Sequence, residues 1–182
     1  MRRGAFVALA LAALTVAACG TPAPASSPPA GGSCANDLPP RTSPTDFPVA
    51  VLHVAGDDLP PVMGDVEWLG GASDVSHEPA RPVYQERFTV LQAQGQIEVS
   101  LRMSDGVRIT AWTVDAVPDG QFRSGDLESD RVRWSEGDDP TDLVCIPVQD
   151  GGWAIIANVT FADGAGSGSY YWRLNLSQTP GT

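Results

Sequence analysis

The sequence predicts an all-β protein, a two-sheet antiparallel β-sandwich of immunoglobulin-like architecture. From Phe47 onward apolar residues recur at every second position, which is typical of strands with one buried face. Turn dipeptides that contain glycine separate these runs, and no stretch of about ten residues has the 3.6-residue period of an amphipathic helix. A closed β-barrel would produce the same pattern and is the alternative architecture.

The alternation predicts three strands most clearly, over residues 97–103, 153–161 and 170–176, each with one apolar face. Weaker alternation predicts six more strands, over residues 49–55, 66–69, 82–91, 107–117, 131–134 and 143–148. Eight or nine strands with alternating faces usually form two packed sheets rather than one. This number of strands therefore favours the sandwich.

Turn signals predict how neighbouring strands pair. Asp105-Gly106 and Asp150-Gly151 are dipeptides that favour the two-residue type I′ turn of a β-hairpin. The glycine-rich segment 163–168 predicts a third, longer hairpin loop, so that the last strands form an antiparallel meander. Residues 57–82 are rich in Gly, Pro and Asp, and we expect them to loop over one end of the sandwich.

Residues 1–18 have the pattern of a secretory signal, because Arg2 and Arg3 precede an apolar segment at residues 5–16. That segment is too short to span a bilayer, which takes roughly 20 apolar residues. Residues 19–33 are rich in Pro, Ala and Ser and predict an extended tether. Residues 34–182 then have the length of a single domain.

The apolar segment closes on Val16-Ala17-Ala18-Cys19, which resembles the lipobox of bacterial lipoproteins. The resemblance implies that Cys19 becomes the first residue of the mature chain and carries a diacylglyceryl thioether. Two acyl chains, at about 0.8 kcal/mol per buried methylene, hold a protein on a bilayer far better than one chain does. We therefore expect a protein anchored in membrane lipid through Cys19, on the extracytoplasmic face of the cell membrane. The alternative is an ordinary secretory signal in which Cys19 has no role.

The chain has three cysteines, and the lipobox resemblance assigns Cys19 to lipid. Cys34 and Cys145 are then the pair left to form a disulfide in an oxidising compartment. The bridge would close a loop of about 110 residues, for which the chain-entropy model gives roughly 4 to 5 kcal/mol. Two free thiols are the alternative.

The charge of the chain is strongly acidic, with 22 Asp and Glu against 11 basic residues, all of them Arg. The formal net charge is −11, and it becomes −13 when Arg2 and Arg3 leave with the signal. Such a surface repels nucleic acid and anionic lipid headgroups. We therefore expect no nucleic-acid partner.

The sequence predicts no catalytic residue. The nucleophile motifs Gly-x-Ser-x-Gly and Ser-x-x-Lys are both absent, and the chain has two histidines. His53 lies within a predicted strand, where a half-buried spacer role is expected. His77 lies in a predicted loop beside Asp74 and Ser76, and neighbours in one loop rarely preorganise as a catalytic triad does.

Asp126, Glu128 and Asp130 are the candidate metal ligands, because three carboxylates two residues apart begin a calcium-binding loop in this way. Arg131 stands where such an EF-hand loop requires glycine, so the full motif is absent. Solvated acidic loops are the alternative reading. Calcium is the one cofactor for which the sequence offers candidates, and no other cofactor is expected.

Trp68 and Tyr171 are the candidate ligand-facing aromatics, since exposed aromatic rings can stack on sugar rings or anchor a protein partner. Together with the missing catalytic motifs, they favour a non-catalytic binding module for an envelope protein or glycan. One alternative is an extracytoplasmic hydrolase that uses acidic loop residues such as Asp57, Asp58 and Asp65. A calcium-stabilised spacer domain is the other.

Overall fold

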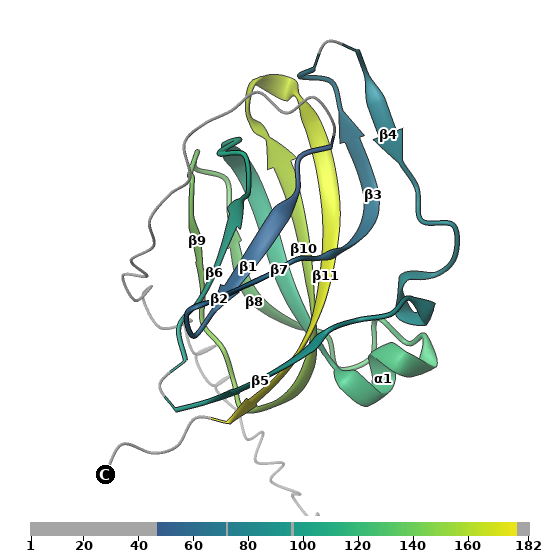
Figure 1. Cartoon of the computed structure of the whole chain (residues 1–182), viewed down its shortest axis with the longest axis vertical. Coiled ribbons are helices and arrows are strands. Elements are labelled where there is room, and N and C mark those ends of the chain that lie inside the picture. Colours follow the sequence, from purple (N-terminus) through teal and green to yellow (C-terminus); the bar gives the residue numbers. More distant parts are fainter. Residues whose placement is uncertain (1–46, 72, 96, 178–182) are drawn as a thin grey trace, which may run out of the picture.

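The computed structural model describes residues 47–71, 73–95 and 97–177, which form a β-sandwich of two sheets (Figure 1). The predicted fold class is confirmed, and neither sheet closes into a barrel. The four-stranded sheet has the order β2 (Asp57–Leu59), β1 (Ala50–Val54), β6 (Val99–Met103) and β9 (Val144–Ile146). The path of the seven-stranded sheet is β4 (Val75–His77), β3 (Val62–Trp68), β11 (Gly166–Ser177), β10 (Gly151–Phe161), β7 (Ile109–Pro118) and β8 (Val132–Gly137).

The seventh strand, β5 (Val90–Gln94), lies off this path and pairs with β11. Two strands share one edge of β11, because β3 pairs antiparallel with its first half and β5 pairs parallel with Arg173 to Ser177. Along its other edge β11 pairs antiparallel with β10 over nearly its whole length. The long β10–β11 hairpin, closed by the short helix η2 (Ala162–Gly164), is therefore the centre of the larger sheet.

The main core lies between the two sheets, where alternate residues of facing strands are fully buried. Two buried hydrogen bonds from β11 add to this packing. The Tyr170 hydroxyl donates to the Pro48 carbonyl at 2.6 Å, and Trp172 Nε1 donates to the Leu59 carbonyl at 3.0 Å. Because Leu59 belongs to β2, the second bond joins the two sheets directly.

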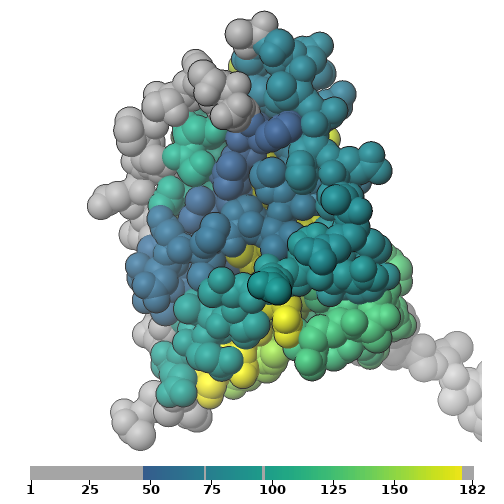
Figure 2. All heavy atoms as spheres, turned by 45° about the vertical axis from the view of Figure 1, so that its right-hand side comes forward, coloured from purple at the N-terminus to yellow at the C-terminus, as the bar shows by residue number. Residues whose placement is uncertain are grey.

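A second apolar cluster covers part of the outer face of the seven-stranded sheet. It joins Ala154 and Ile156 of β10 to Phe122 of helix α1 (Asp119–Ser124) and to Val83 of the short helix η1 (Val83–Gln85). Figure 2 shows α1 in green beside the teal segment that holds η1. This part of β10 is consequently buried on both faces, whereas the part nearer the hairpin keeps an open outer face.

The structure confirms one of the three predicted hairpins. The 163–168 segment joins β10 to β11, as predicted. The Asp105-Gly106 turn forms, with Gly106 at φ 72° and the Val107 amide donating to Asp105 Oδ1 at 3.2 Å, but it connects β6 to β7, which lie in different sheets. Asp150-Gly151 likewise connects β9 to β10 across the sheets. The predicted C-terminal meander is therefore wrong, because turn chemistry fixes a local reversal and not the sheet that the next strand joins.

Two further predictions about elements are wrong. Residues 57–82 are expected to form a loop apart from a strand at 66–69, but they contain β2, β3 and β4. Strands β2 and β4 have three residues each, too few to show alternation, and β3 begins at Val62, four residues before the predicted strand. Residues 82–91 were expected to form a strand but contain η1 and only the start of β5. Val83 and Phe88 pack toward α1 in the second cluster, so their spacing reflects that contact and not a sheet face.

Candidate functional site

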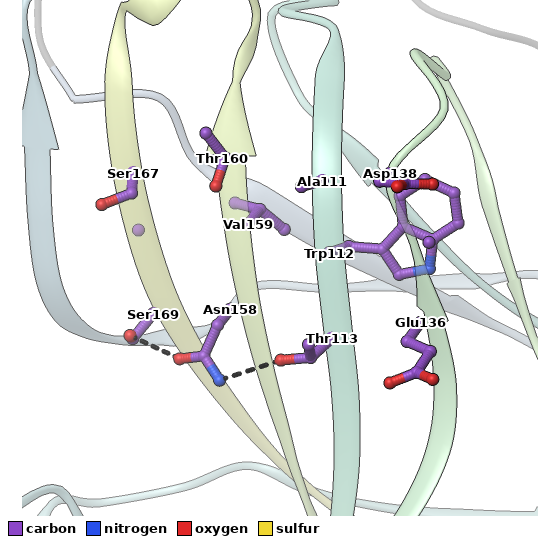
Figure 3. A pocket seen from close by; sticks show the side chains of 12 residues that line it. Ala111, Trp112, Thr113, Glu136, Asp138, Asn158, Val159, Thr160, Ser167 and Ser169 are labelled. Atoms are coloured by element: carbon purple, nitrogen blue, oxygen red, sulfur yellow. Dashed lines mark hydrogen bonds between the residues drawn. The ribbon is translucent and has the colours of Figure 1, made fainter.

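A groove of about 750 Å³ lies on the outer face of the seven-stranded sheet, near the β10–β11 hairpin (Figure 3). Its lining comes from four adjacent strands: Ala111, Trp112 and Thr113 of β7, Glu136 and Gly137 of β8 with Asp138 directly after it, Asn158, Val159 and Thr160 of β10, and Ser167, Gly168 and Ser169 of β11. Strands lie about 4.8 Å apart, so the floor of the groove spans roughly 15 Å across the strands.

The groove exists because the outward positions of the central strands carry short side chains. Residues that pair across adjacent strands point to the same face, so Thr113, Asn158 and Ser169 form one row. Ala111, Thr160 and Ser167 form the next row toward the hairpin in the same way. Longer acidic side chains stand at the margins of these rows, and the sheet face between them is a shallow trough.

The first row is hydrogen-bonded from strand to strand, as the dashed lines in Figure 3 show. The Ser169 hydroxyl donates to Asn158 Oδ1 at 2.7 Å, and Asn158 Nδ2 donates to Thr113 Oγ1 at 3.3 Å. These bonds orient the Asn158 amide in the middle of the floor. The Thr113 hydroxyl hydrogen and the second amide hydrogen of Asn158 still have capacity for a ligand.

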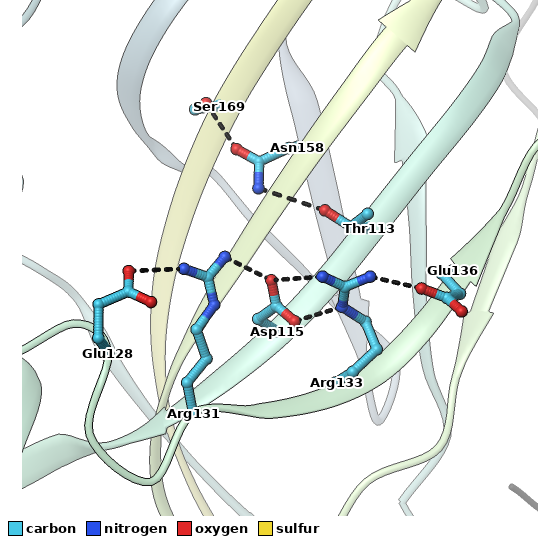
Figure 4. A network of polar contacts seen from close by, with 8 residues as sticks. All are labelled: Thr113, Asp115, Glu128, Arg131, Arg133, Glu136, Asn158 and Ser169. Atoms are coloured by element: carbon cyan, nitrogen blue, oxygen red, sulfur yellow. Dashed lines mark hydrogen bonds and ion pairs between the residues drawn. The ribbon is translucent and has the colours of Figure 1, made fainter.

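An ion network lies beside the groove, on the side away from the hairpin (Figure 4). Asp115, whose side chain is 2% exposed, accepts from Arg131 Nη2 at 2.6 Å and from Nε of Arg133. Arg133 Nη1 in turn donates to Glu136 Oε2 at 2.5 Å, and Arg131 donates to Glu128 at 3.0 Å. The hydrogen bond to Asp115 raises the pKa of Arg133 above its usual value. The network thus holds the Glu136 carboxylate at the margin of the groove.

Trp112 also lines the groove, but its ring lies over Gly137 of β8 rather than over the polar rows. Trp112 Nε1 donates to the Ser135 hydroxyl at 3.1 Å, which fixes the ring there. A Cβ atom at position 137 would overlap the ring, so glycine is required at this position.

Neither of the two predicted ligand-facing aromatics is an exposed platform. Trp68 is 5% exposed and packs edge-on against Phe161 in the main core, with 5.6 Å between ring centroids. Its prediction is wrong because its side chain lies on the inner face of β3. Tyr171 does lie on the outer face but is half-buried beside Phe122, and burial raises the pKa of its phenol.

The three calcium candidates do not assemble into a site. Asp126 Oδ1 accepts from the backbone amides of Glu128 and Ser129, and Asp130 accepts from Gln121 Nε2 at 2.6 Å. Glu128 is paired with an arginine, as described above. Within residues 47–71, 73–95 and 97–177, no three His, Cys, Asp or Glu side chains lie together in a way that could hold a metal ion. The predicted calcium loop is a loop tied by its own hydrogen bonds.

The acidic residues considered for a hydrolase lie apart. Asp57 and Asp58 belong to β2 of the smaller sheet, and Asp65 belongs to β3 of the larger one. Asp58 accepts from His53 Nδ1 at 2.8 Å and from Arg102 at 2.6 Å. These partners lower the pKa of Asp58 below its ordinary value of 3.8, chiefly through the hydrogen bond from His53 and next through the charge of Arg102.

His53 forms part of a row that the sequence did not indicate. It pairs with Asp58 on one side and with Ser100 of β6 on the other. The histidine thus lies between an acid and a serine, as it does in a serine triad. Ser100 is only 1% exposed, so a substrate carbonyl has no access to its hydroxyl. His77 lies in β4 and not in a loop, and its ring packs edge-on against Phe47 at 5.7 Å. In the described part of the chain neither histidine has an accessible nucleophile bonded to it.

Two of the predicted modification sites lie outside the described residues. Cys19, the lipidation site, and Cys34 both belong to the segment before Phe47. Cys145 is half-buried in β9 and pairs across the strands with Ser100. The lipid anchor and the disulfide stay predictions. Among the helices that the structure describes, none has the length and apolar character to cross a membrane.

Comparisons with known proteins found no matching family model and no matching curated protein. Solved structures do match, and two of them cover half of this chain and 60% of their own length. One is a polysaccharide monooxygenase, CBM33, with 16% identity and a TM-score of 0.35. The other is the catalytic domain of an LPMO from Listeria monocytogenes, with 13% identity and a TM-score of 0.34. Similarity of this size carries no argument about what this chain does.

Proposed function

We propose that this chain is a lipid-anchored extracytoplasmic module that binds an envelope glycan, without catalysis, in the groove on its larger sheet. The observation that supports the proposal is the lining of that groove. Its floor is built from hydroxyl and amide side chains on four adjacent strands, and carboxylates stand at its margin. Such groups donate and accept hydrogen bonds in the pattern that the hydroxyl groups of a saccharide require.

A glycan fits this groove better than a protein surface does. Protein interfaces depend on a few large aromatic or aliphatic anchors packed in apolar pockets. The large hydrophobic residues exposed in the described part of the chain are Leu69, Val90 and Val132, and none of them lines the groove. The open floor offers polar groups instead.

The absence of an assembled reactive pair in the groove supports a binding role rather than hydrolysis. The carboxylates closest to its floor are Glu136, which is bonded to Arg133, and Asp138. Glycoside hydrolysis takes two carboxyl groups that flank the scissile bond, whereas Glu136 and Asp138 stand together at the β8 margin of the groove. The groove residues are therefore suited to bind a saccharide and not to cleave it.

Blocking the groove tests its role. Ser167 and Ser177 are both exposed on β11, but only Ser167 lies in the groove. We expect Ser167→Tyr, in the full chain purified in detergent, to lose binding to oligosaccharides released from the cell envelope. The matched variant Ser177→Tyr should bind as the parent does. Equal binding by both variants, or no saccharide binding by the parent, would overturn the proposal.

The anchor is tested separately in cells. We expect a metabolically incorporated fatty-acid analogue to label the chain through Cys19. Cys19→Ala should lose the label and move out of the membrane fraction. If the parent stays unlabelled and the variant fractionates with membranes as before, the lipid anchor is wrong.

A further inference from the structure

We infer that the groove selects a saccharide that carries positive charge, such as one with protonated amino groups. The inference rests on the proposed function, because it names the ligand class of the same groove. It is carried by the sign and the placement of the charges around the polar rows, and by the pairing of the arginines elsewhere in the fold.

The charged side chains that line the groove are all carboxylates. Glu136 and Asp138 are the ionisable side chains in its lining, and they stand at the β8 margin. Glu67 of β3 pairs with Ser167 across β11, so its side chain projects from the same face at the opposite margin. A ligand that lies across the floor therefore has a carboxylate near each of its ends.

The arginines of the described ranges do not neutralise these margins. Most of them are bonded to carboxylates that do not line the groove, and these are Arg81, Arg102, Arg108, Arg123, Arg131 and Arg173. Of the three carboxylates at the margins, Arg133 offsets only the charge of Glu136, and its other bonds go to buried Asp115. Asp138 and Glu67 form no hydrogen bond or ion pair with any residue that the structure describes. Their charge is left for a ligand.

The polar rows and the marginal carboxylates select different features of a ligand. Thr113, Asn158 and Ser169 can bond hydroxyl groups of any saccharide, whatever its charge. Asp138 and Glu67 distinguish among saccharides, because they attract an ammonium group, leave a neutral amide unaffected and repel a carboxylate. The net charge of −11 adds long-range repulsion of anionic chains.

The experiment compares three oligosaccharides of equal length on the full chain in detergent, at a pH where amines are protonated. They are an amino-sugar oligomer, its N-acetylated form and a uronic-acid oligomer. Two exposed ion pairs predict that the amine form binds roughly 2- to 30-fold more tightly than the acetylated form. The preference should shrink as salt is added, since the Debye length falls to about 3 Å at 1 M.

The double variant Asp138→Asn with Glu67→Gln should abolish this preference while keeping the shape of both side chains. Asp57→Asn, which changes an exposed carboxylate on the smaller sheet, is the matched control and should keep the preference. Circular dichroism spectra that match the parent confirm that the variants are folded.

Three results would overturn the inference. The first is equal affinity for the amine and acetylated forms, and the second is an unchanged preference in the double variant. The third concerns an oligo-arginine peptide used as a control ligand: it should not bind through the same two carboxylates as tightly as the amino-sugar oligomer does. In the first two cases the block by Ser167→Tyr still reports on the proposed function, which survives if the neutral saccharide binds the parent and not that variant. If no saccharide binds the parent, the proposed function itself fails.

Discussion

The buried Asp115 allows the energetics of the groove's supporting network to be tested by a single change, Asp115→Asn. The carboxylate is 2% exposed and accepts hydrogen bonds from Arg131 and Arg133. Asparagine keeps the shape but loses the charge, and it turns an NH₂ group toward one of the guanidinium groups. A hydrogen bond to a charged group contributes about 1.5 to 3 kcal/mol, and breaking a fully buried ion pair costs about 3 to 5 kcal/mol.

The two arginine side chains are 28% and 43% exposed, so water can solvate them again once Asp115 no longer does. This lowers the cost below that of a fully buried pair. We therefore expect Asp115→Asn to lower the free energy of unfolding by about 2 to 3 kcal/mol. The loss of anchoring for Glu136 should accompany it.

The assay is urea unfolding followed by tryptophan fluorescence, with a shift in midpoint at unchanged slope as the expected result. Glu128→Gln is the matched control, because Glu128 belongs to the same network but its side chain is 82% exposed. We expect that variant to lose no more than about 0.5 kcal/mol. Equal effects of the two substitutions, or an Asp115→Asn variant as stable as the parent, would refute the reasoning that burial gives this network its strength.

Three other substitutions have defined outcomes. Gly137→Ala should lower the free energy of unfolding by about 1 to 3 kcal/mol, because the added methyl group displaces the Trp112 ring from its place over β8. The measurement is a shifted tryptophan emission together with a lower urea midpoint. Tyr170→Phe should cost about 1 to 3 kcal/mol in the same assay, because it leaves the buried Pro48 carbonyl without its 2.6 Å donor, and a midpoint equal to the parent's would contradict that bond. Because the fold lowers the pKa of Asp58 from 3.8, its contribution to stability is present above that pH and is lost as the pH falls below it. Asp58→Asn should therefore flatten the dependence of the thermal midpoint on pH below about 4, and an unchanged acid limb would count against the pair with its histidine.

The fold class could be predicted from the sequence because the alternation of apolar and polar residues is clear in the two longest strands. In β10 and β11, apolar side chains occupy every second position over about ten residues. Burial follows that period along β11, and in β10 it does so outside the part that α1 covers. The turn between them needed only local glycine chemistry. The period also placed β1, β6, β7 and β9 close to their observed ranges.

The predictions of strand pairing that are wrong concern features that contacts between distant residues determine. Asp105-Gly106 is a good turn, but whether β7 stays in the sheet of β6 depends on its pairing with β10, which lies about 40 residues further along the chain. The prediction that Trp68 faces a ligand is wrong because its alternation with Val66 puts both side chains on the buried face of β3.

The groove had a signal in the sequence that neither the charged nor the aromatic residues carry. The outward positions Thr113, Asn158, Thr160 and Ser167 are all short and polar, while the outward positions nearer to α1 are Ile156 and Tyr171. A run of short polar residues on one face of the strongest strands predicts an uncovered face. That these residues lie in one row required the strand register, which only the structure supplies.

The most direct test of the central claim is a nuclear magnetic resonance titration of the full chain with the amino-sugar oligomer, observed at two side-chain amides. Asn158 lies in the middle of the groove floor, and Asn175 is exposed at the other end of β11. If the groove is the binding surface, the NH₂ resonances of Asn158 shift until saturation while those of Asn175 stay in place. Shifts at Asn175 alone, or at neither amide while the oligomer is bound, would contradict the account.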